Sequence, residues 1–131
     1  MRVVDGRGYP ALADGIIGRY HSENGMDPAG PHGGARILLA VEGEEAVGFV
    51  SFRRHTIDAL YAADGAPEDT EERLLRAVTA VMINEGRPSL SIHSVDPEGR
   101  AERACRRMGF IEDGTCPCCQ RDGAVCLNLR F

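Results

Sequence analysis

The stretch Ile57 to Leu75, IDALYAADGAPEDTEERLL, decides the fold, because a strand pattern passes there into a helix pattern. Residues 57–62 are a mostly apolar run, which is typical of a β-strand. Pro67 and the acids after it favour the first turn of a helix, where free N–H groups and the dipole attract negative charge. The helix would end at Gly86, since glycine is favoured just beyond a helix C-terminus. Its predicted buried face consists of Leu74, Leu75, Val78, Val81 and Met82.

On both sides of this stretch, strand and helix patterns alternate. The runs 37–41 and 46–52 flank a polar turn and predict a hairpin. A helix is predicted over about 10–21, a long glycine-rich loop over 22–35 and a strand over 90–95. A second apolar helical stripe runs from Ala101 to Met108, with Asp96 as its expected N-cap. Strands opening at 110–111 and covering 124–131 complete an α/β (α+β) fold, in which helices flank a mixed, mostly antiparallel sheet.

Composition narrows the classes of function. The chain has 131 residues and a formal net charge of -5, so we expect one domain over 1–131 and no nucleic-acid partner. No apolar run approaches the ~20 residues of a membrane span, so no membrane partner is expected. The N-terminal residues show no apolar signal region, which predicts a cytoplasmic protein. In that compartment the five cysteines would be thiols or metal ligands rather than disulfides.

The order of elements, together with two short motifs, resembles the GCN5-related N-acetyltransferase (GNAT) superfamily. The helix from Ala101 ends in Met108-Gly109-Phe110, which is similar to the family's helix followed by Gly-Phe. The hairpin strand with Val47-Gly48-Phe49 is similar to the family's hydrophobic-Gly-hydrophobic strand. The resemblance covers roughly 36–131, and more loosely the first helix. It implies a GNAT-like domain that transfers an acyl group from acetyl-CoA to an amine of a small molecule or peptide.

The resemblance also implies a phosphate-binding loop between the strand at 57–62 and its helix. The family pattern has an arginine or glutamine and two glycines there, and these positions fall near Ala66, Asp69 and Glu71. The glycines would let backbone N–H groups approach phosphate without a Cβ in the way. Acids instead stand beside the expected phosphates, which predicts a degenerate loop. The backbone of Leu60 and Tyr61 would flank the thioester in the family geometry.

The same acidic segment also has a purely structural interpretation. Asp69 could cap the helix, with Glu72 three residues later completing a capping box. On this interpretation the acids stabilise an ordinary helix start and do not report on a ligand.

Three residues are candidates for catalysis. Asp58 and His93 lie on the strands where a general base would be expected in the family. Cys105 stands at the position of the family's catalytic tyrosine, where a thiol could donate a proton to the leaving thiolate. Each has a structural alternative: a strand-edge acid for Asp58, a strand histidine satisfied by its neighbours for His93, and a buried core thiol for Cys105.

A cysteine cluster near the C-terminus suggests a different chemistry. Cys116, Cys118 and Cys119 lie close in sequence, and Cys126 could reach them across a hairpin. Four thiolates could hold a structural Zn²⁺, which prefers tetrahedral sulfur ligands. A redox pair or disulfide between Cys116 and Cys119 is a second interpretation, and unpaired thiols are a third.

The sequence therefore leaves three hypotheses open. The first is an acetyl-CoA-dependent N-acyltransferase with an atypical phosphate loop. The second is a degenerate GNAT-fold binding or regulatory module without acyl-CoA. The third is a metal or thiol protein built on the cysteine cluster. A homodimer is common for such folds, and nothing in the sequence decides that question or identifies the acceptor.

Overall fold

The computed structural model describes residues 1–23, 35–95, 99–112 and 125–131. The first part of the chain contains β1 (Arg2–Asp5), η1 (Gly6–Gly8), α1 (Pro10–Glu23), β2 (Arg36–Glu42), β3 (Glu45–Arg53) and β4 (Thr56–Ala62). The second part contains α2 (Thr70–Asn84), β5 (Ser89–Val95), α3 (Arg100–Met108), β6 (Ile111–Glu112) and β7 (Val125–Arg130). Among these described helices, none is long and apolar enough to cross a membrane.

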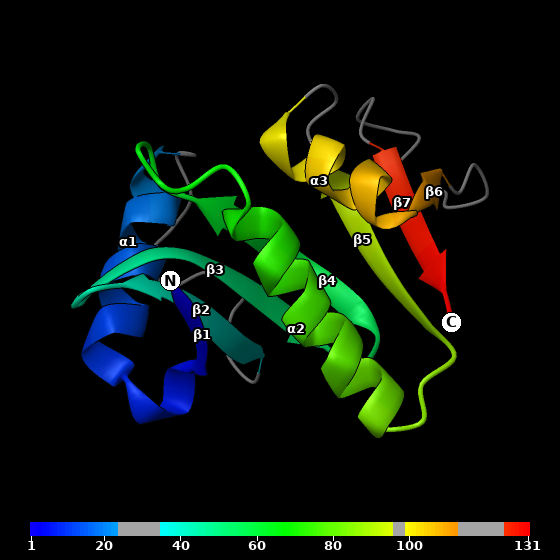
Figure 1. The fold of residues 1–131 in the computed structure, drawn as a ribbon, viewed down its shortest axis with the longest axis horizontal. Helices are drawn as coiled ribbons and strands as arrows, with labels where there is room; N and C mark the ends of the chain where they lie inside the picture. Colours follow the sequence, from blue (N-terminus) through cyan, green and yellow to red (C-terminus); the bar gives the residue numbers. More distant parts are fainter. Residues whose placement is uncertain (24–34, 96–98, 113–124) are drawn as a thin grey trace.

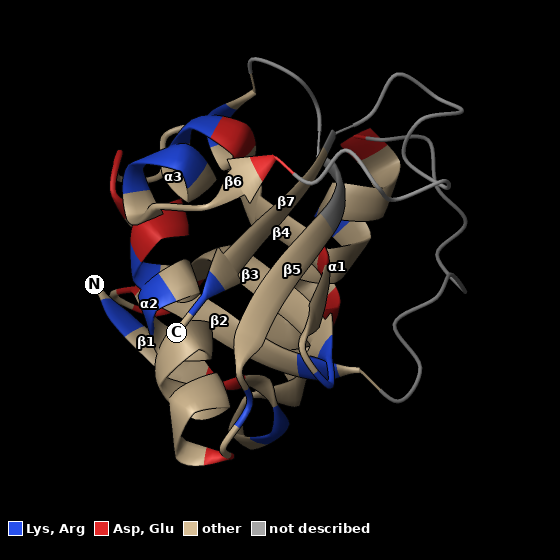
Figure 2. Cartoon of the chain, turned by 90° about the vertical axis from the view of Figure 1, so that its right-hand side faces the viewer, with Lys and Arg blue, Asp and Glu red and all other residues tan. Residues whose placement is uncertain are grey.

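The described strands form one sheet in the order β1-β2-β3-β4-β5-β7-β6. Each neighbouring pair is antiparallel except β4 and β5, which are parallel and are connected through α2. Helix α1 covers one face of the sheet, while α2 and α3 lie on the other (Figure 1 and Figure 2). The predicted α/β (α+β) class, with a mixed and mostly antiparallel sheet, is therefore confirmed.

Two apolar layers hold the sheet to its helices. Between the sheet and α2 and α3, the fully buried side chains include Phe52, Ile57, Leu74 and Met82. Beneath α1 a second cluster contains Ile16, Leu39, Val41, Phe49 and Ala59. The predicted face of α2 is correct, because Leu74, Leu75, Val78 and Met82 are fully buried and Val81 packs against them. At about 25 cal/mol per Å² of apolar surface, such layers supply the main driving force for folding.

The two glycine motifs of the sequence have local structural causes. A Cβ added to Gly48 would lie 2.6 Å from the carbonyl oxygen of Tyr61 and 2.9 Å from Cγ2 of Thr70, so only glycine fits between β4 and α2. Gly109 has φ +100° and ends α3 in the left-handed conformation that favours glycine. The amide of Phe110 then donates to the carbonyl of Cys105 at 3.0 Å, which satisfies the helix C-terminus.

Element boundaries differ from the prediction at two helix starts. Helix α3 begins at Arg100 with Gly99 in the N-cap position, and the predicted cap, Asp96, lies outside the described residues. In α2, Asp69 occupies the N-cap position but its side chain makes no capping hydrogen bond with the described residues. Its carboxylate instead pairs with Nε of Arg73 at 2.9 Å, so the predicted capping box is wrong. Thr70 makes the local contact instead, since its hydroxyl donates to the carbonyl of Pro67 at 2.7 Å.

Candidate functional site

A β-bulge in β4 marks the centre of the candidate site. Strand β3 pairs Phe52 with Ile57 and Ser51 with Ala59, so Asp58 is an additional residue on β4 without a ladder partner on β3. A bulge bends its strand, increases the local twist and often ends regular pairing. Here the bulge directly follows Ile57, the last residue of β4 that pairs with β5.

The parallel ladder between β4 and β5 is short. It contains only the pairs Thr56 with Ser91 and Ile57 with Ile92, although both strands continue beyond them within the described residues. The two strands separate from this point toward the end of the sheet nearest α3 (Figure 1). Among the described residues, the edge of β4 over 58–62 therefore has no ladder partner on β5, and we call this unpaired stretch the opening.

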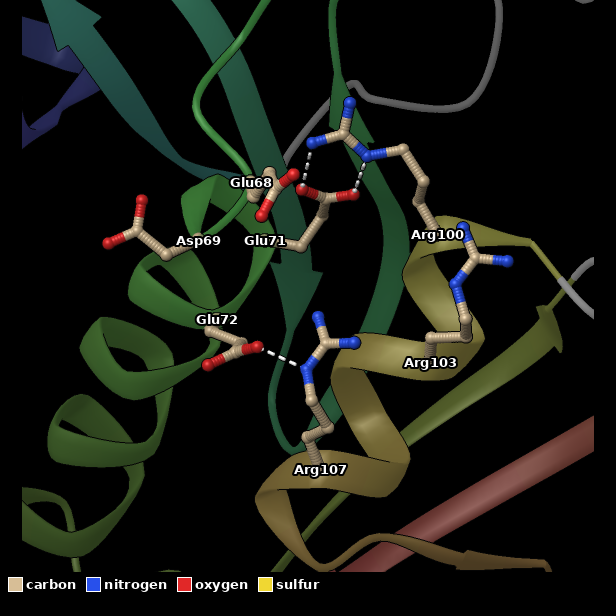
Figure 3. A pocket seen from close by; sticks show the side chains of 7 residues that line it. All are labelled: Glu68, Asp69, Glu71, Glu72, Arg100, Arg103 and Arg107. Carbon is tan, nitrogen blue, oxygen red and sulfur yellow. Dashed lines mark hydrogen bonds and ion pairs between the residues drawn. The ribbon is translucent and has the colours of Figure 1, made fainter.

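A pocket lies beyond the open end, between the start of α2 and α3. Its volume is about 630 Å³, and its lining comes from the residues that follow β4 and β5 in the chain. Acids from the α2 side face arginines from α3 (Figure 3). The lining residues are Glu68, Asp69, Glu71, Glu72, Arg100, Arg103 and Arg107.

The most buried carboxylate in this pocket, that of Glu71, is paired with Arg100. The Glu71 side chain is 3% exposed, and its two oxygens accept hydrogen bonds from Nε and Nη2 of Arg100 at 2.9 and 3.0 Å. Nη2 of Arg100 also donates to the carbonyl of Pro67 at 3.3 Å. This fork-like pairing gives the buried carboxylate a partner of opposite charge, without which its burial would be costly.

A second pair closes the other side of the pocket. Nε of Arg107 donates to the carboxylate of Glu72, and both side chains point toward the pocket (Figure 3). The Asp69 carboxylate points away toward Arg73, whereas Ala66 lies in the preceding turn, its amide bonded to the carbonyl of Ala63 at 3.0 Å. Of the predicted phosphate-loop positions, the structure therefore brings Glu71 and Asp69 to the pocket lining and leaves Ala66 outside it.

Aromatic side chains form the α1 side of the site. Tyr61 extends from β4 toward α1 and lies within 5.4 Å of Tyr20 and 6.0 Å of Phe49, measured between ring centroids. Its hydroxyl donates to the Glu23 carboxylate at 2.5 Å. Partial burial and this carboxylate raise the pKa of Tyr61 to about 12, and the hydrogen bond lowers the pKa of Glu23. Glu23 thus stays ionised near neutral pH beside the β4 edge.

The predicted catalytic residues fall in different surroundings. Asp58 is the bulge residue, and its carboxylate lies 3.2 Å from Nε of Arg53. The backbone of His93 follows Ile92, the last β5 residue paired with β4, so His93 and Asp58 flank the point where the strands separate. Cys105 instead lies in the core with no exposed surface, and burial raises its thiol pKa to about 12. Burial favours the core alternative for Cys105, while its catalytic role stays a prediction.

The cysteine cluster lies mostly beyond the described residues. Cys116, Cys118 and Cys119 fall outside them, whereas Cys126 is buried in β7 and is disulfide-bonded. Within the part of the chain that the structure describes, no group of three metal-ligating side chains occurs. A disulfide-bonded Cys126 has no thiolate to offer a metal, so the prediction of thiols or metal ligands rather than disulfides is wrong for Cys126, and it is not a fourth zinc ligand. The roles of Cys116, Cys118 and Cys119 stay predictions.

Sequence reasoning missed the arginines of the pocket and the role of Glu23. Arg100, Arg103 and Arg107 occur at i, i+3 and i+7, which places them on one face of a helix. That spacing predicts a basic helix face, although its acidic partners on α2 could be assigned only from the tertiary structure. Glu23 and Tyr61 are 38 positions apart, so no local pattern in the sequence predicts their contact.

Comparisons with known proteins identify the fold. No protein-family model matches the chain, and no curated protein matches its sequence. Solved structures do match, including a GNAT-family acetyltransferase from Staphylococcus aureus Mu50, with TM-score 0.74, 14% identity and 98% of each chain covered. An aminoglycoside 6'-acetyltransferase type Ii matches with TM-score 0.73, 15% identity and coverage of 99% and 97%.

A further match is the PaiA N-acetyltransferase from Thermoplasma acidophilum in complex with coenzyme A. Its TM-score is 0.60 at 13% identity, over 86% of this chain and 66% of that one. At such identities the agreement concerns the backbone, and it extends over nearly the whole length of the first two structures. The chain has the fold of the GCN5-related N-acetyltransferases, as the resemblance in its sequence predicted.

Proposed function

We propose that the protein is an N-acyltransferase that takes an acyl thioester along β4 and transfers the acyl group to an amine of a small molecule or peptide. The observation that carries this proposal is the early end of the β4–β5 ladder at Ile57 and Ile92. An exposed strand edge can be completed by an extended chain through backbone hydrogen bonds. The pantetheine arm of acyl-CoA is such a chain, with two amide groups, and it suits this opening.

The reaction forms a carbon–nitrogen bond and breaks a carbon–sulfur bond and one N–H bond of the amine. The amine nitrogen bonds to the thioester carbonyl carbon, the carbon–sulfur bond breaks, and the thiolate leaves. The amine must lose a proton during the reaction, so an acceptor group is needed near the thioester. Asp58 and His93 flank the start of the opening and are our candidates for this role, and the backbone of Leu60 and Tyr61 would lie along the acyl chain.

The acceptor side also has a charge preference. The Glu23 carboxylate lies beside Tyr61 at the edge of β4, and Nε of Arg19 lies 3.2 Å from it and offsets part of its charge. The remaining negative charge would attract a protonated amine toward the opening. This arrangement supports a cationic small molecule or peptide amine as the acceptor class.

A direct test offers the purified protein several amines and one donor. Acetyl-CoA and acetyl-pantetheine would each be incubated with spermidine, kanamycin and a lysine-containing peptide, and the products identified by mass spectrometry. We expect an amide product that disappears or shifts its pH profile in Asp58→Asn or His93→Ala. No product with any amine, together with no calorimetric heat from either donor, would contradict the proposal.

The second candidate, a binding module without acyl-CoA, is favoured by one observation. Glu71 and Glu72 already satisfy Arg100 and Arg107, so the pocket beyond the opening needs no anionic ligand to balance its charges. Tight acetyl-CoA binding without turnover would support a binding role, whereas catalytic turnover would exclude it.

A further inference from the structure

The pocket between α2 and α3 is the place where a donor lying along β4 would extend. It begins beyond Ala62, the last residue of β4, and its walls come from the segments that follow β4 and β5. A nucleotide attached to the far end of the pantetheine arm would bring its phosphates to this pocket. The charges of the pocket therefore decide whether those phosphates contribute to binding.

The pocket already contains a carboxylate in the position that an anion would seek. Glu71 is buried near the N-terminus of α2, and both of its oxygens are bonded to Arg100. A phosphate needs the same partners, namely a guanidinium fork and the positive end of a helix dipole. It could gain them only by displacing a carboxylate that is tethered to the chain and has almost no access to water.

The remaining charges do not compensate. Glu72 pairs with Arg107 through the Nε of that arginine, and Glu68 and Asp69 add two further acids to the lining. Four carboxylates and three guanidinium groups line the pocket, but Asp69 is paired with Arg73 outside it, so the three remaining acids and the three arginines balance. A diphosphate would therefore enter a site that has no excess positive charge to attract it.

The backbone of this segment does not offer a substitute. Residues 66, 69 and 71 are alanine, aspartate and glutamate, so each carries a Cβ where backbone amides would otherwise approach a phosphate closely. The amide of Ala66 is already bonded to the carbonyl of Ala63. The diphosphate end of coenzyme A therefore does not fit this pocket, whereas the opening along β4 suits the pantetheine end.

We propose that the buried Glu71–Arg100 pair replaces the phosphate contact, and that the protein recognises its donor as an acyl-pantetheine thioester rather than as a nucleotide. The proposal rests on the proposed acyltransferase function. It identifies Glu71 as the residue that sets donor specificity, and it makes the nucleotide of acetyl-CoA dispensable. Any acyl-pantetheine carrier whose arm reaches the opening then qualifies as a donor.

The test compares two donors that differ only in the nucleotide part. With a fixed amine acceptor, we expect kcat/KM for acetyl-pantetheine and acetyl-CoA to agree within roughly fivefold, because the pocket gives the phosphates no net attraction. Adenosine 3',5'-bisphosphate should neither inhibit the reaction nor produce heat in a titration. Preference for acetyl-CoA by roughly a hundredfold or more, with competitive inhibition by the bisphosphate, would overturn the proposal.

Variants make the assignment to Glu71 specific. Glu71→Gln removes one negative charge and leaves Arg100 available, so it should raise the preference for acetyl-CoA by roughly tenfold and allow the bisphosphate to bind. Glu44→Gln removes the same charge from an exposed turn between β2 and β3 and should change neither quantity. An unchanged preference in a folded Glu71→Gln protein would count against the proposal.

Two further measurements distinguish an unfolded variant or a wrong proposed function from a wrong proposal about donor specificity. If Glu71→Gln loses its cooperative thermal transition, the double variant Glu68→Gln with Glu72→Gln tests the same charge effect without touching the buried pair. If no donor is turned over, the proposed function fails. The bisphosphate titration of the wild type and of Glu71→Gln still decides whether this pocket rejects phosphates through Glu71.

Discussion

Glu71 and Glu72 are adjacent in sequence, yet their side chains differ in exposure. Their ion pairs therefore differ in how much they contribute to the free energy of unfolding. The Glu71 side chain is 3% exposed and that of Glu72 is 21% exposed. Removing one member of a buried pair leaves an uncompensated charge, whereas an exposed pair contributes little. The stability of the α2–α3 contact should therefore depend on Arg100 far more than on Arg107.

This difference predicts the outcome of two alanine substitutions. Arg100→Ala should lower the free energy of unfolding by on the order of 3 kcal/mol, at the low end of the range because Arg100 is itself partly exposed. Arg107→Ala should cost less than about 1 kcal/mol. Urea denaturation measures both values. Equal losses would mean that the burial of Glu71 does not govern the contact.

Because the Cys105 thiol is buried, we expect the free energy of unfolding to depend on pH in the alkaline range. Burial, followed by the charge of Glu102, raises its pKa from 9.0 to about 12. The folded state therefore keeps the proton that the unfolded state releases above pH 9, so the free energy of unfolding falls as pH rises between these two values. The slope for one proton approaches ~1.4 kcal/mol per pH unit.

The measurement is chemical denaturation at pH 8 and at about pH 10.5, where a thiol with the ordinary pKa of 9.0 is largely ionised. Cys105→Ala should lose less stability across that interval than the wild type, although it is less stable at pH 8 because it leaves a small cavity. Identical pH slopes in the two proteins would show that Cys105 titrates normally and is not a core thiol.

Between β3, β4 and α2, Gly48 controls how closely the elements approach. Gly48→Ala would place a Cβ 2.6 Å from the backbone oxygen of Tyr61, which cannot move without disturbing β4. We expect a loss of about 1–3 kcal/mol in the free energy of unfolding, as for overpacking in a core.

The matched control is Gly18→Ala in α1, where an added Cβ meets no atom within 4 Å. In a helix interior this change should stabilise the protein by about 0.5–1 kcal/mol, because alanine restricts the unfolded chain. Thermal melts of both variants measure whether Gly48→Ala loses stability while Gly18→Ala gains it. A harmless Gly48→Ala would mean that β3 and α2 can separate, and that the glycine is not required by close packing.

The relation of α1 to β4 gives a prediction for the acceptor. Glu23 ends α1 and accepts a hydrogen bond from the Tyr61 hydroxyl, so it supplies a negative charge beside the opening that Arg19 offsets only in part. Glu23→Gln should raise KM for a cationic amine by roughly three- to tenfold, with a smaller effect at high ionic strength, because screening weakens exposed charges. The turnover number should change less than KM. An effect that is independent of salt would point to a structural role for the Glu23–Tyr61 contact.

For the whole molecule, the sequence predicted the fold better than the site. Periodic apolar residues such as Leu74, Val78 and Met82 identify α2 and its buried face without tertiary information. Gly109 likewise reports a helix end, because its positive φ is a local requirement. The acids at 68–72 were also recognised, but their arginine partners lie 29 and 35 residues further along the chain. From the sequence alone, these acids were expected to repel a phosphate. In the structure, Glu71 and Glu72 are instead paired with arginines of α3, and that pairing depends on how α3 packs on α2.

The sheet as a whole consists of two parts joined by a short ladder. Strands β1 to β4 are continuous by antiparallel pairing, and so are β5, β7 and β6, but β4 and β5 share only two residue pairs. Open strand edges of this kind exchange their amide hydrogens more readily than paired ones. A donor that lies in the opening would complete the hydrogen bonding of both edges at once.

This geometry predicts a specific pattern of hydrogen exchange. Acetyl-pantetheine at saturating concentration should slow exchange in peptides covering both 58–63 and 89–95, because the bound chain bridges the two edges. Adenosine 3',5'-bisphosphate, which lacks the pantetheine arm, should leave both peptides unchanged in the wild type. Protection of α2 and α3 alone would place the ligand in the acid–arginine pocket and would contradict binding along β4. Protection of both strand edges by acetyl-pantetheine alone would show that the opening in the sheet, without the pocket, is sufficient to hold the donor.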